Sequence, residues 1–309
     1  MTTNLKKIVN NIPLLFLIII FFALLKDADL VLKSSINAAT LFFTKLFPCM
    51  FIFYTLQDLL LNYGILKIFI KFFSPLSKKL FHLDACSSYI IFMSMLTGFP
   101  SGSKYITDFY NKKYIDRNTA NYLLTFTHFS NPLFILGTVS VITTKRMALI
   151  ILLSHFLSNF VVAFFTRPKL YIEKSIPQTR EKKSLTTCLN DSFQNTFSIV
   201  KIVFCTTIFF VVIITLFTSF IPNTYLKTIL FGLFDLTKGV TEVNKLSLTM
   251  YQKGILICSF ISLGGVSVHM QVQSIIAQKK LSYPAFLKGR IASTGINLLL
   301  YTILCSCIL

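Results

Sequence analysis

The sequence predicts an all-α integral membrane protein with about seven transmembrane helices and two re-entrant hairpins, arranged in two repeats of inverted topology. Three observations lead to this fold class. The 309-residue chain is 54% hydrophobic and only 13% charged. Apolar runs long enough to cross a bilayer alternate with short basic segments. Several of these runs, in both halves, are interrupted by glycine, proline or polar residues, a pattern typical of transporters.

The net charge is strongly positive, +19, from 30 Lys and Arg against 11 Asp and Glu. Because the basic residues lie between apolar runs, we expect them to orient the chain and to contact anionic lipid headgroups, and we expect no binding of nucleic acid. The seven cysteines have no C-x-x-C spacing, which argues against a disulfide framework or a metal site. Membrane lipid and a small polar solute are the expected partners, a homo-oligomer is left open, and no cofactor is expected.

Residues 1–34 are predicted to form an N-terminal membrane anchor helix. Their apolar core, residues 12–25, is shorter than an average span, so a signal peptide is the alternative. We favour an uncleaved helix because no small-x-small cleavage site follows. Residues 35–61 are long enough to span, and lysines then alternate with apolar residues between 62 and 85, as in an amphipathic helix on the membrane surface.

The remaining apolar runs divide into two halves with the same order of elements. The first repeat, 35–166, continues with an interrupted run at 86–110, a run with a proline break at 120–142 and a span at 147–165. Residues 167–192 form the one long polar segment and are predicted to be a basic cytoplasmic linker. The second repeat, 193–309, consists of a span at 193–221, an interrupted run at 225–250, a broken run at 254–277 and a span at 284–308.

Charge decides how the first interrupted run crosses the membrane. If residues 86–110 spanned the bilayer, the strongly basic linker 167–192 would lie outside the cell, against the positive-inside rule. If the run enters and returns as a hairpin, the linker lies inside. The same reasoning makes 225–250 a second hairpin that enters from the outside, so that the two halves run in opposite directions.

The first hairpin contains the segment from Thr97 to Lys104. Its glycines and proline prevent a continuous helix, and irregular backbone at membrane depth either packs inside the protein or lines a polar cavity. The plainer alternative is a tight turn, with Lys104 extending to the interface and Asp108 as its ion-pair partner. The residues proposed to bind solute here are Gly98, Pro100, Ser101, Gly102, Ser103 and Lys104.

The run 120–142 breaks at Ser130, Asn131 and Pro132. Proline frees a carbonyl one turn back, and Asn131 supplies both donor and acceptor groups at the unwound point, which makes it the strongest single candidate. His128 is a candidate proton carrier, with a structural, hydrogen-bonded histidine as the equal alternative.

In the second half, Asp235, Lys238 and Glu242 share one helix face. They are candidates for ion pairs or for a coupling-cation site, and a wet vestibule is the third alternative. Gly264 and Gly265 permit a helix break, and together with Ser267, His269 and Gln271 just after it they are predicted to bind solute. In the last span, the expected position of Arg290 is the membrane interface, with contacts from Arg290 and Asn297 to the cavity as the alternative.

The sequence predicts no enzyme. It contains no G-x-S-x-G, no H-E-x-x-H, no Walker loop and no cluster of Cys and His.

Three ordered motifs carry a family resemblance. They are Leu96-Thr97-Gly98-Phe99-Pro100-Ser101-Gly102-Ser103-Lys104, Ser130-Asn131-Pro132-Leu133-Phe134-Ile135-Leu136-Gly137 and Gly264-Gly265-Val266-Ser267-Val268-His269-Met270-Gln271-Val272. With them the chain, over residues 35–309, resembles the sporulation integral membrane proteins of the YlbJ type, within the nucleoside-recognition or Gate superfamily. The resemblance implies a fold like that of concentrative nucleoside transporters, a multi-pass location in the cell membrane of a spore-forming bacterium, and a role in formation of the spore cortex.

The function expected from residues and resemblance together is transport of a small polar solute, at a site between the broken helices near the bilayer midplane. The alternative is a membrane scaffold that does not transport and recruits partners for cortex assembly. The resemblance names no solute, and nucleosides enter only by analogy to the superfamily.

Overall fold

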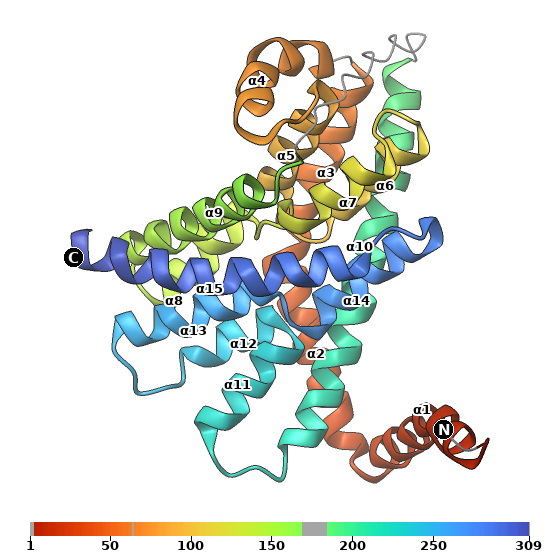
Figure 1. Ribbon diagram of the computed structural model, residues 1–309. Helices are drawn as coiled ribbons and strands as arrows, with labels where there is room; N and C mark the ends of the chain where they lie inside the picture. The colour runs from red at the N-terminus through yellow and green to blue at the C-terminus, as the bar shows by residue number, and fades with distance from the viewer. Residues whose placement is uncertain (1–2, 64, 169–183, 309) are drawn as a thin grey trace.

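A computed structural model describes residues 3–63, 65–168 and 184–308, and these residues form helices joined by short connections (Figure 1). Helix α1 (Thr3–Lys26) ends at Asp27, and the chain turns sharply into α2 (Ala28–Leu41). The π-helical turn η1 (Phe42–Leu46) joins α2 to α3 (Phe47–Asn62), with a bend of 46° between Ala28–Leu46 and Met50–Asn62. Pro48 at the start of α3 explains the bend, because proline cannot donate to the preceding turn.

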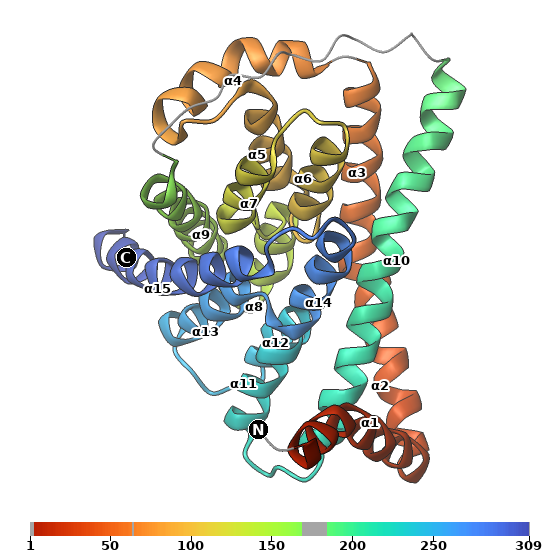
Figure 2. The same cartoon turned by 45° about the vertical axis from the view of Figure 1, so that its right-hand side comes forward.

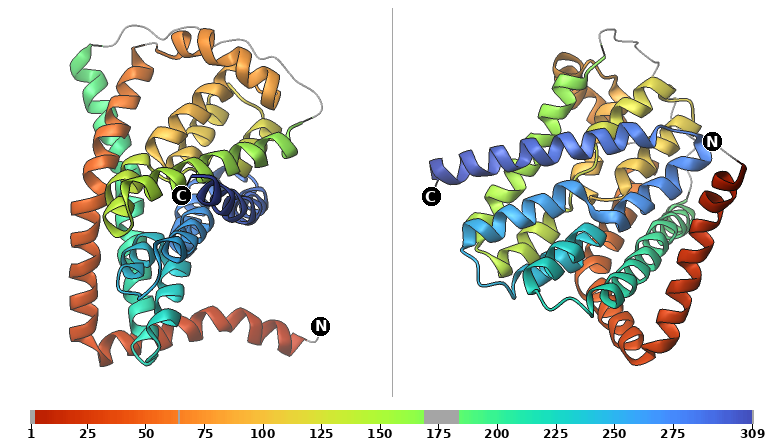
Figure 3. Two further views of the ribbon diagram at one scale, coloured as in Figure 1. Left: turned by 90° about the vertical axis from the view of Figure 1, so that its left-hand side faces the viewer. Right: turned by 60° about the horizontal axis from the view of Figure 1, so that its bottom comes forward.

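The N-terminal anchor differs from a simple span. Figure 3 shows α1 lying across the end of α2 rather than alongside it. Leu17 and Phe22 of α1 are exposed. The sharp change of direction falls where Asp27 and Asp29 interrupt the apolar run.

Helix α4 (Ile65–Phe81) corresponds to the predicted surface helix. Its end Phe72–Phe81 makes an angle of 96° with α5 (Ala85–Thr97), as a helix in the membrane plane would with one that enters the bilayer. Asp84 begins α5, because its side chain accepts a hydrogen bond from the Ser87 N–H at 2.8 Å.

The first interrupted run is a pair of short helices, α5 and α6 (Ser101–Asn111), which pack against each other (Figure 2). Helix α7 (Arg117–Phe126) follows and ends before an irregular stretch at 127–131. The chain resumes as the π-helical segment η2 (Phe134–Val139), α8 (Ser140–Ile142) and α9 (Lys145–Thr166). The predicted run 120–142 is therefore broken at the Asn131–Pro132 position into two short pieces.

The second half begins with α10 (Leu185–Thr218), whose first residues fall inside the range predicted as linker. Ser184 caps this helix and so places its start earlier than the apolar composition suggested. A pair of short helices follows, α11 (Thr224–Phe234) and α12 (Leu236–Val243). The last elements are α13 (Met250–Leu263), α14 (Gly265–Ile276), the turn η3 (Ala277–Lys279) and α15 (Tyr283–Ile308).

Apart from α4, which has no counterpart in the second half, the chain from α3 and the chain from α10 have the same order of elements: a long helix, two short helices, a broken helix and another long helix. The corresponding long helices lie side by side, α3 with α10 and α9 with α15 (Figure 2). Among the described residues, four helices are long and apolar enough to cross a membrane, or up to six if each of two bent pairs is one span. The buried core lies where the short helices meet α9, α13 and α15, whereas Leu153, Leu157 and Leu299 point outward, as lipid-facing side chains do.

Candidate functional site

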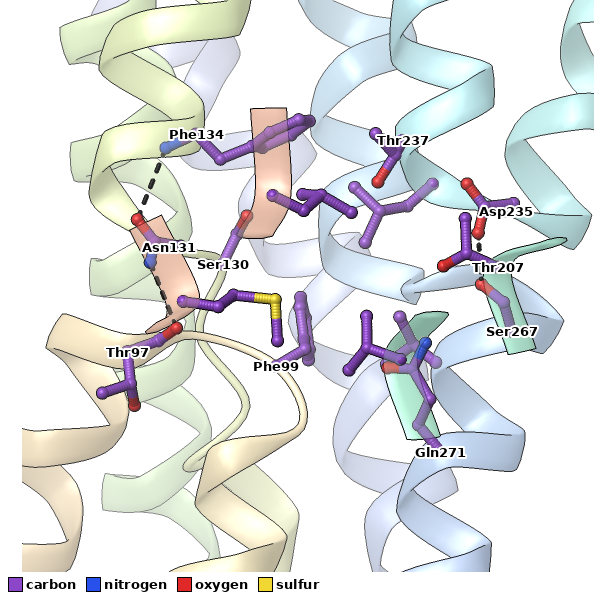
Figure 4. Close-up of a pocket in the computed structure, with 15 residues that line it drawn as sticks. Thr97, Phe99, Ser130, Asn131, Phe134, Thr207, Asp235, Thr237, Ser267 and Gln271 are labelled. Atoms are coloured by element: carbon purple, nitrogen blue, oxygen red, sulfur yellow. Dashed lines mark hydrogen bonds between the residues drawn. The ribbon is translucent and has the colours of Figure 1, made fainter. Parts of the chain in front are cut away.

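The interruptions of both halves converge on one internal cavity of about 50 Å³ (Figure 4). An engineered cavity of roughly 150 Å³ holds benzene, so the present one has room for a small ion or a few water molecules. Its polar lining residues are Thr97, Ser130, Asn131, Thr207, Asp235, Thr237, Ser267 and Gln271. Its apolar lining residues are Leu46, Met50, Phe99, Phe134, Val203, Leu236 and Val268.

On the first-half wall, Asn131 ties two elements together. Its Nδ2 donates to the Thr97 carbonyl at 3.2 Å, at the end of α5. Its Oδ1 accepts from the Leu133 N–H at 2.7 Å, in the turn that leads into η2. Gly98 makes this contact sterically feasible. Its φ is +77°, and a Cβ at this position would lie 2.5 Å from the backbone nitrogen of Asn131.

On the second-half wall, Asp235 lies between two helix starts. One carboxylate oxygen accepts from the Lys238 N–H at 2.9 Å and so caps α12, while the other accepts from the Ser267 hydroxyl at 2.8 Å in the first turn of α14. The carboxylate is 3% exposed. The backbone N–H at the start of α12 and the Ser267 hydroxyl therefore offset part of the cost of burying this carboxylate.

The chemistry of the cavity is that of hydrogen bonding. Hydroxyl and amide groups dominate its polar lining, with Asp235 as the one ionisable side chain among the lining residues. In the described part of the chain, no group of three or more His, Cys, Asp or Glu side chains is placed to hold a metal ion. Such a lining suits a solute with donors and acceptors of its own.

The structure brings five of the predicted residues to the cavity: Ser130, Asn131, Asp235, Ser267 and Gln271. Most of the others have partners of their own, but neither ring nitrogen of His128 has a hydrogen-bond partner among the described residues, which argues against the hydrogen-bonded alternative for this histidine. The Ser101 hydroxyl bonds to Thr97 and to the Gly98 carbonyl, and Ser103 Oγ donates to the Pro100 carbonyl at 2.6 Å. Gly102 packs against the Thr127 carbonyl, and Pro132, Gly264 and Gly265 shape the two breaks without lining the cavity.

The charged candidates lie in ion pairs. Lys104 Nζ is 2.9 Å from Asp108 Oδ1, the plainer of the two alternatives for Asp108. Glu242 binds Lys238 at 2.7 Å and Lys245 at 2.8 Å. His269 bridges the Leu263 carbonyl and the Tyr283 hydroxyl, each at 2.9 Å, and the His128 ring packs against Phe286.

Arg290 is not at the membrane interface, where the sequence placed it. Its side chain is fully buried, and all its hydrogen-bond partners are neutral oxygens. The guanidinium donates to the His128 carbonyl at 2.9 Å and the Thr125 carbonyl at 3.4 Å, just at and beyond the end of α7. It also donates to the Ser262 carbonyl at 3.4 Å, at the end of α13. These carbonyls lack intrahelical partners because both helices stop there, so one arginine serves both breaks.

A second buried residue that the sequence did not single out, His155 of α9, also joins the two breaks. Its Nε2 accepts from the Ser130 N–H at 3.0 Å, so the proton lies on Nδ1, which is 3.3 Å from Ser262 Oγ. Asn159, one turn on, accepts from Arg290 at 2.6 Å. A regular spacing of Ser154, His155, Ser158 and Asn159 along α9 was the available signal, and it marks a polar face directed inward.

Thr207 and Thr237 also line the cavity, although the sequence did not predict them as site residues. A threonine in an apolar helix commonly bonds its own backbone, so composition does not distinguish these two from others such as Thr215.

No family model matches the chain. The chain is similar to the "Sporulation integral membrane protein YlbJ" of Bacillus subtilis (strain 168). The two are 24% identical in an alignment of 331 positions, which covers 93% of this chain and 81% of that protein. The similarity and the apolar helices together identify a multi-pass integral membrane protein. They support the assignment that the three motifs suggested, to the YlbJ type of sporulation integral membrane proteins.

Proposed function

We propose that the chain is a transporter or channel-like carrier that moves a small polar solute needed for formation of the spore cortex, rather than an enzyme. The observation that carries the proposal is the polar cavity where the broken helices of the two halves meet. Irregular backbone inside a membrane is costly unless it is packed in protein or lines a cavity, and transporters use such breaks to build their sites. The sporulation role rests on the similarity to the Bacillus protein.

We also propose that the halves are two repeats of inverted topology, in a gate fold with two re-entrant hairpins. In this arrangement α5–α6 enters from the side of α4, and α11–α12 enters from the opposite end (Figure 2). The connections at 112–117 and 280–282 then share one face, and Arg117 does donate to the Lys280 carbonyl at 2.7 Å. The basic linker 167–192 belongs on that cytoplasmic face.

The small volume of the cavity suits a closed conformation. A carrier that works by alternating access must open to each side in turn, and rocking of one repeat against the other would widen the cavity. Arg290 and His155, which bind both breaks, would then move with or release one half.

The test is thermal unfolding of the purified protein in detergent, with nucleosides, nucleobases, small carboxylates, polyols and metal ions. A ligand present at 100 times its Kd stabilises the folded state by about 2.7 kcal/mol and so raises Tm. The shift should disappear in Asn131→Ala and in Ser267→Ala. The controls are Asn111→Ala and Ser306→Ala, which replace the same residue types at exposed positions. Both controls should retain the shift in Tm.

If no compound raises Tm and the cavity variants still support spore formation, the cavity proposal is wrong. The scaffold that recruits cortex-assembly partners then becomes the better explanation, and changes in the linker 167–192 should abolish function instead.

A further inference from the structure

A second, larger pocket of about 260 Å³ opens at the end of α3 and α10 that lies near α4. Its polar lining residues are Asp58, Asn62, Lys112, Asp191, Gln194 and Asn195. Asn195 Nδ2 donates to Asp58 Oδ2 at 2.9 Å and so joins α10 to α3 at the pocket. Like the central cavity, this pocket is lined mainly by hydrogen-bonding groups.

The face of α3 between the two pockets is polar. Met50 lines the central cavity and Asp58 lines the outer pocket, and Tyr54 and Gln57 lie between them at helical spacing. Both are only 3% exposed. Tyr54 donates to the carbonyl of Phe99, a cavity residue, at 3.3 Å, and the Tyr105 hydroxyl of α6 donates to Gln57.

Helix α10 continues this polar face on the other side. Thr196 is buried, and its Oγ1 is 3.2 Å from Thr55 Oγ1 of α3. Ser192, one turn earlier, is fully buried, and its hydroxyl has no hydrogen-bond partner among the described residues. Asn195 reaches the outer pocket and Thr207 reaches the central cavity, but between them Ile199, Val200 and Val203 of α10 are buried and apolar and pack with α3.

The opposite faces of the same helices are apolar. Leu56 and Leu60 of α3 are exposed, as is Phe197 of α10, and lipid would cover them. Helix contacts within a membrane are stable with small or apolar residues, and polar pairs between helices add little to that stability. The polar groups that link the pockets lie on α3 and at its contacts: Asp58, Gln57 and Tyr54 in line, with Tyr105 and the Phe99 carbonyl beside them and Thr196 opposite Thr55. This polar seam has a pocket at each end, which calls for a role beyond holding α3 to α10.

We propose that this seam is the closed access route between the outer pocket and the central cavity, and that the outer pocket is a first binding site for the same solute. Tyr54, Gln57 and Tyr105 form its gate. The solute carries hydroxyl or amide groups, because hydroxyl and amide groups dominate the polar lining of the central cavity, and amides make up half of the polar lining of the outer pocket. This inference rests on the proposed transport function and adds to it the path and the side of entry.

The route can be tested by cysteine labelling of the full-length protein in native membranes, after replacement of Cys49, Cys205 and Cys307 with serine. A small charged methanethiosulfonate reacts only where water reaches the thiol. Gln57→Cys and Thr196→Cys should react at least about tenfold faster than the matched lipid-facing variants Leu56→Cys and Phe197→Cys. Tyr105→Ala should accelerate the labelling of Thr207→Cys in the cavity, whereas Tyr251→Ala, distant from the seam, should leave it unchanged.

Equal rates at seam and lipid-facing positions would overturn the route. If the seam variant on one helix fails to reach the membrane, the labelling rates of the seam and lipid-facing variants on the other helix decide whether the route is hydrated. Since labelling needs no solute, the two proposals separate: a solute that raises Tm while the seam stays unreactive rejects the route and keeps the cavity. A reactive seam with no stabilising compound keeps the hydrated route and rejects transport of the classes tested.

Discussion

Gly102 shows how closely α6 fits against the break that follows α7. A Cβ at this position would lie 2.1 Å from the Thr127 carbonyl oxygen, well inside contact distance. Gly102→Ala must therefore push α6 away from the break, and we expect a loss of roughly 1–3 kcal/mol of stability and a lower Tm. Thermal unfolding in detergent measures the change.

The matched control is Gly295→Ala on α15, where no atom lies within 4 Å of the added Cβ. Because alanine is the better helix former by about 1 kcal/mol, this change should be neutral or slightly stabilising. Equal Tm values for the two variants would mean that α6 does not approach Thr127 as closely as the structure shows.

At the level of single residues, the sequence located the cavity better than it assigned the roles. Asn131, Ser267 and Asp235 stand out because polar groups beside a helix break are hard to place in lipid, and all three line the cavity. Lys104 and Asp108 stood out equally and form an ion pair. Whether a polar residue binds a neighbour or faces a cavity depends on packing between distant segments, which spacing alone does not specify.

Among the helices, the most informative contact is the one made by Arg290 of α15. It supplies donors to carbonyls at the ends of both α7 and α13. Arg290→Met would leave these buried carbonyls unsatisfied, at about 1–3 kcal/mol for each group. We expect a much lower Tm and reduced abundance in the membrane, with partial recovery in Arg290→Lys, which keeps the charge but not the planar fork of donors.

Arg117→Met is the comparison for this change, because Arg117 also donates to a carbonyl but is exposed. Its loss should have little effect. If Arg290→Met proves as stable as Arg117→Met, water or another side chain satisfies the helix ends, and Arg290 is not what holds the two breaks together.

The breaks between helices were easier to predict from the sequence than the position of the Arg290 side chain. Glycine and proline act locally, so the breaks near residues 98, 131 and 264 could be read from the sequence. The position of Arg290 could not, because a basic residue near the end of an apolar run looks the same whether it faces lipid headgroups or two helix ends. The start of α10 at Leu185 was obscured because its first turns are polar.

In the whole molecule, two connections far apart in sequence meet on one face. The Arg117 side chain binds the Lys280 carbonyl at 2.7 Å, and the Ser282 N–H donates to Asn121 Oδ1 at 2.9 Å. An even number of crossings must therefore separate residues 112–117 from 280–282. The count predicted from charge, with two hairpins that do not cross, meets this condition.

The topology itself gives the last prediction. With the basic linker inside the cell, Asn111 lies on the cytoplasmic face, and Ser247, between α12 and α13, lies on the outer face. Both side chains are exposed, which makes Asn111→Cys and Ser247→Cys a matched pair. A membrane-impermeant maleimide added to intact cells that have been stripped of their wall should label Ser247→Cys at once, and Asn111→Cys only after the membrane is permeabilised. The unmodified chain, with its exposed Cys205 and Cys307, sets the background.

Labelling of both positions from the same side would mean that α11–α12 enters from the same face as α5–α6. The inverted repeat, and with it alternating access by rocking of the two halves, would then be wrong.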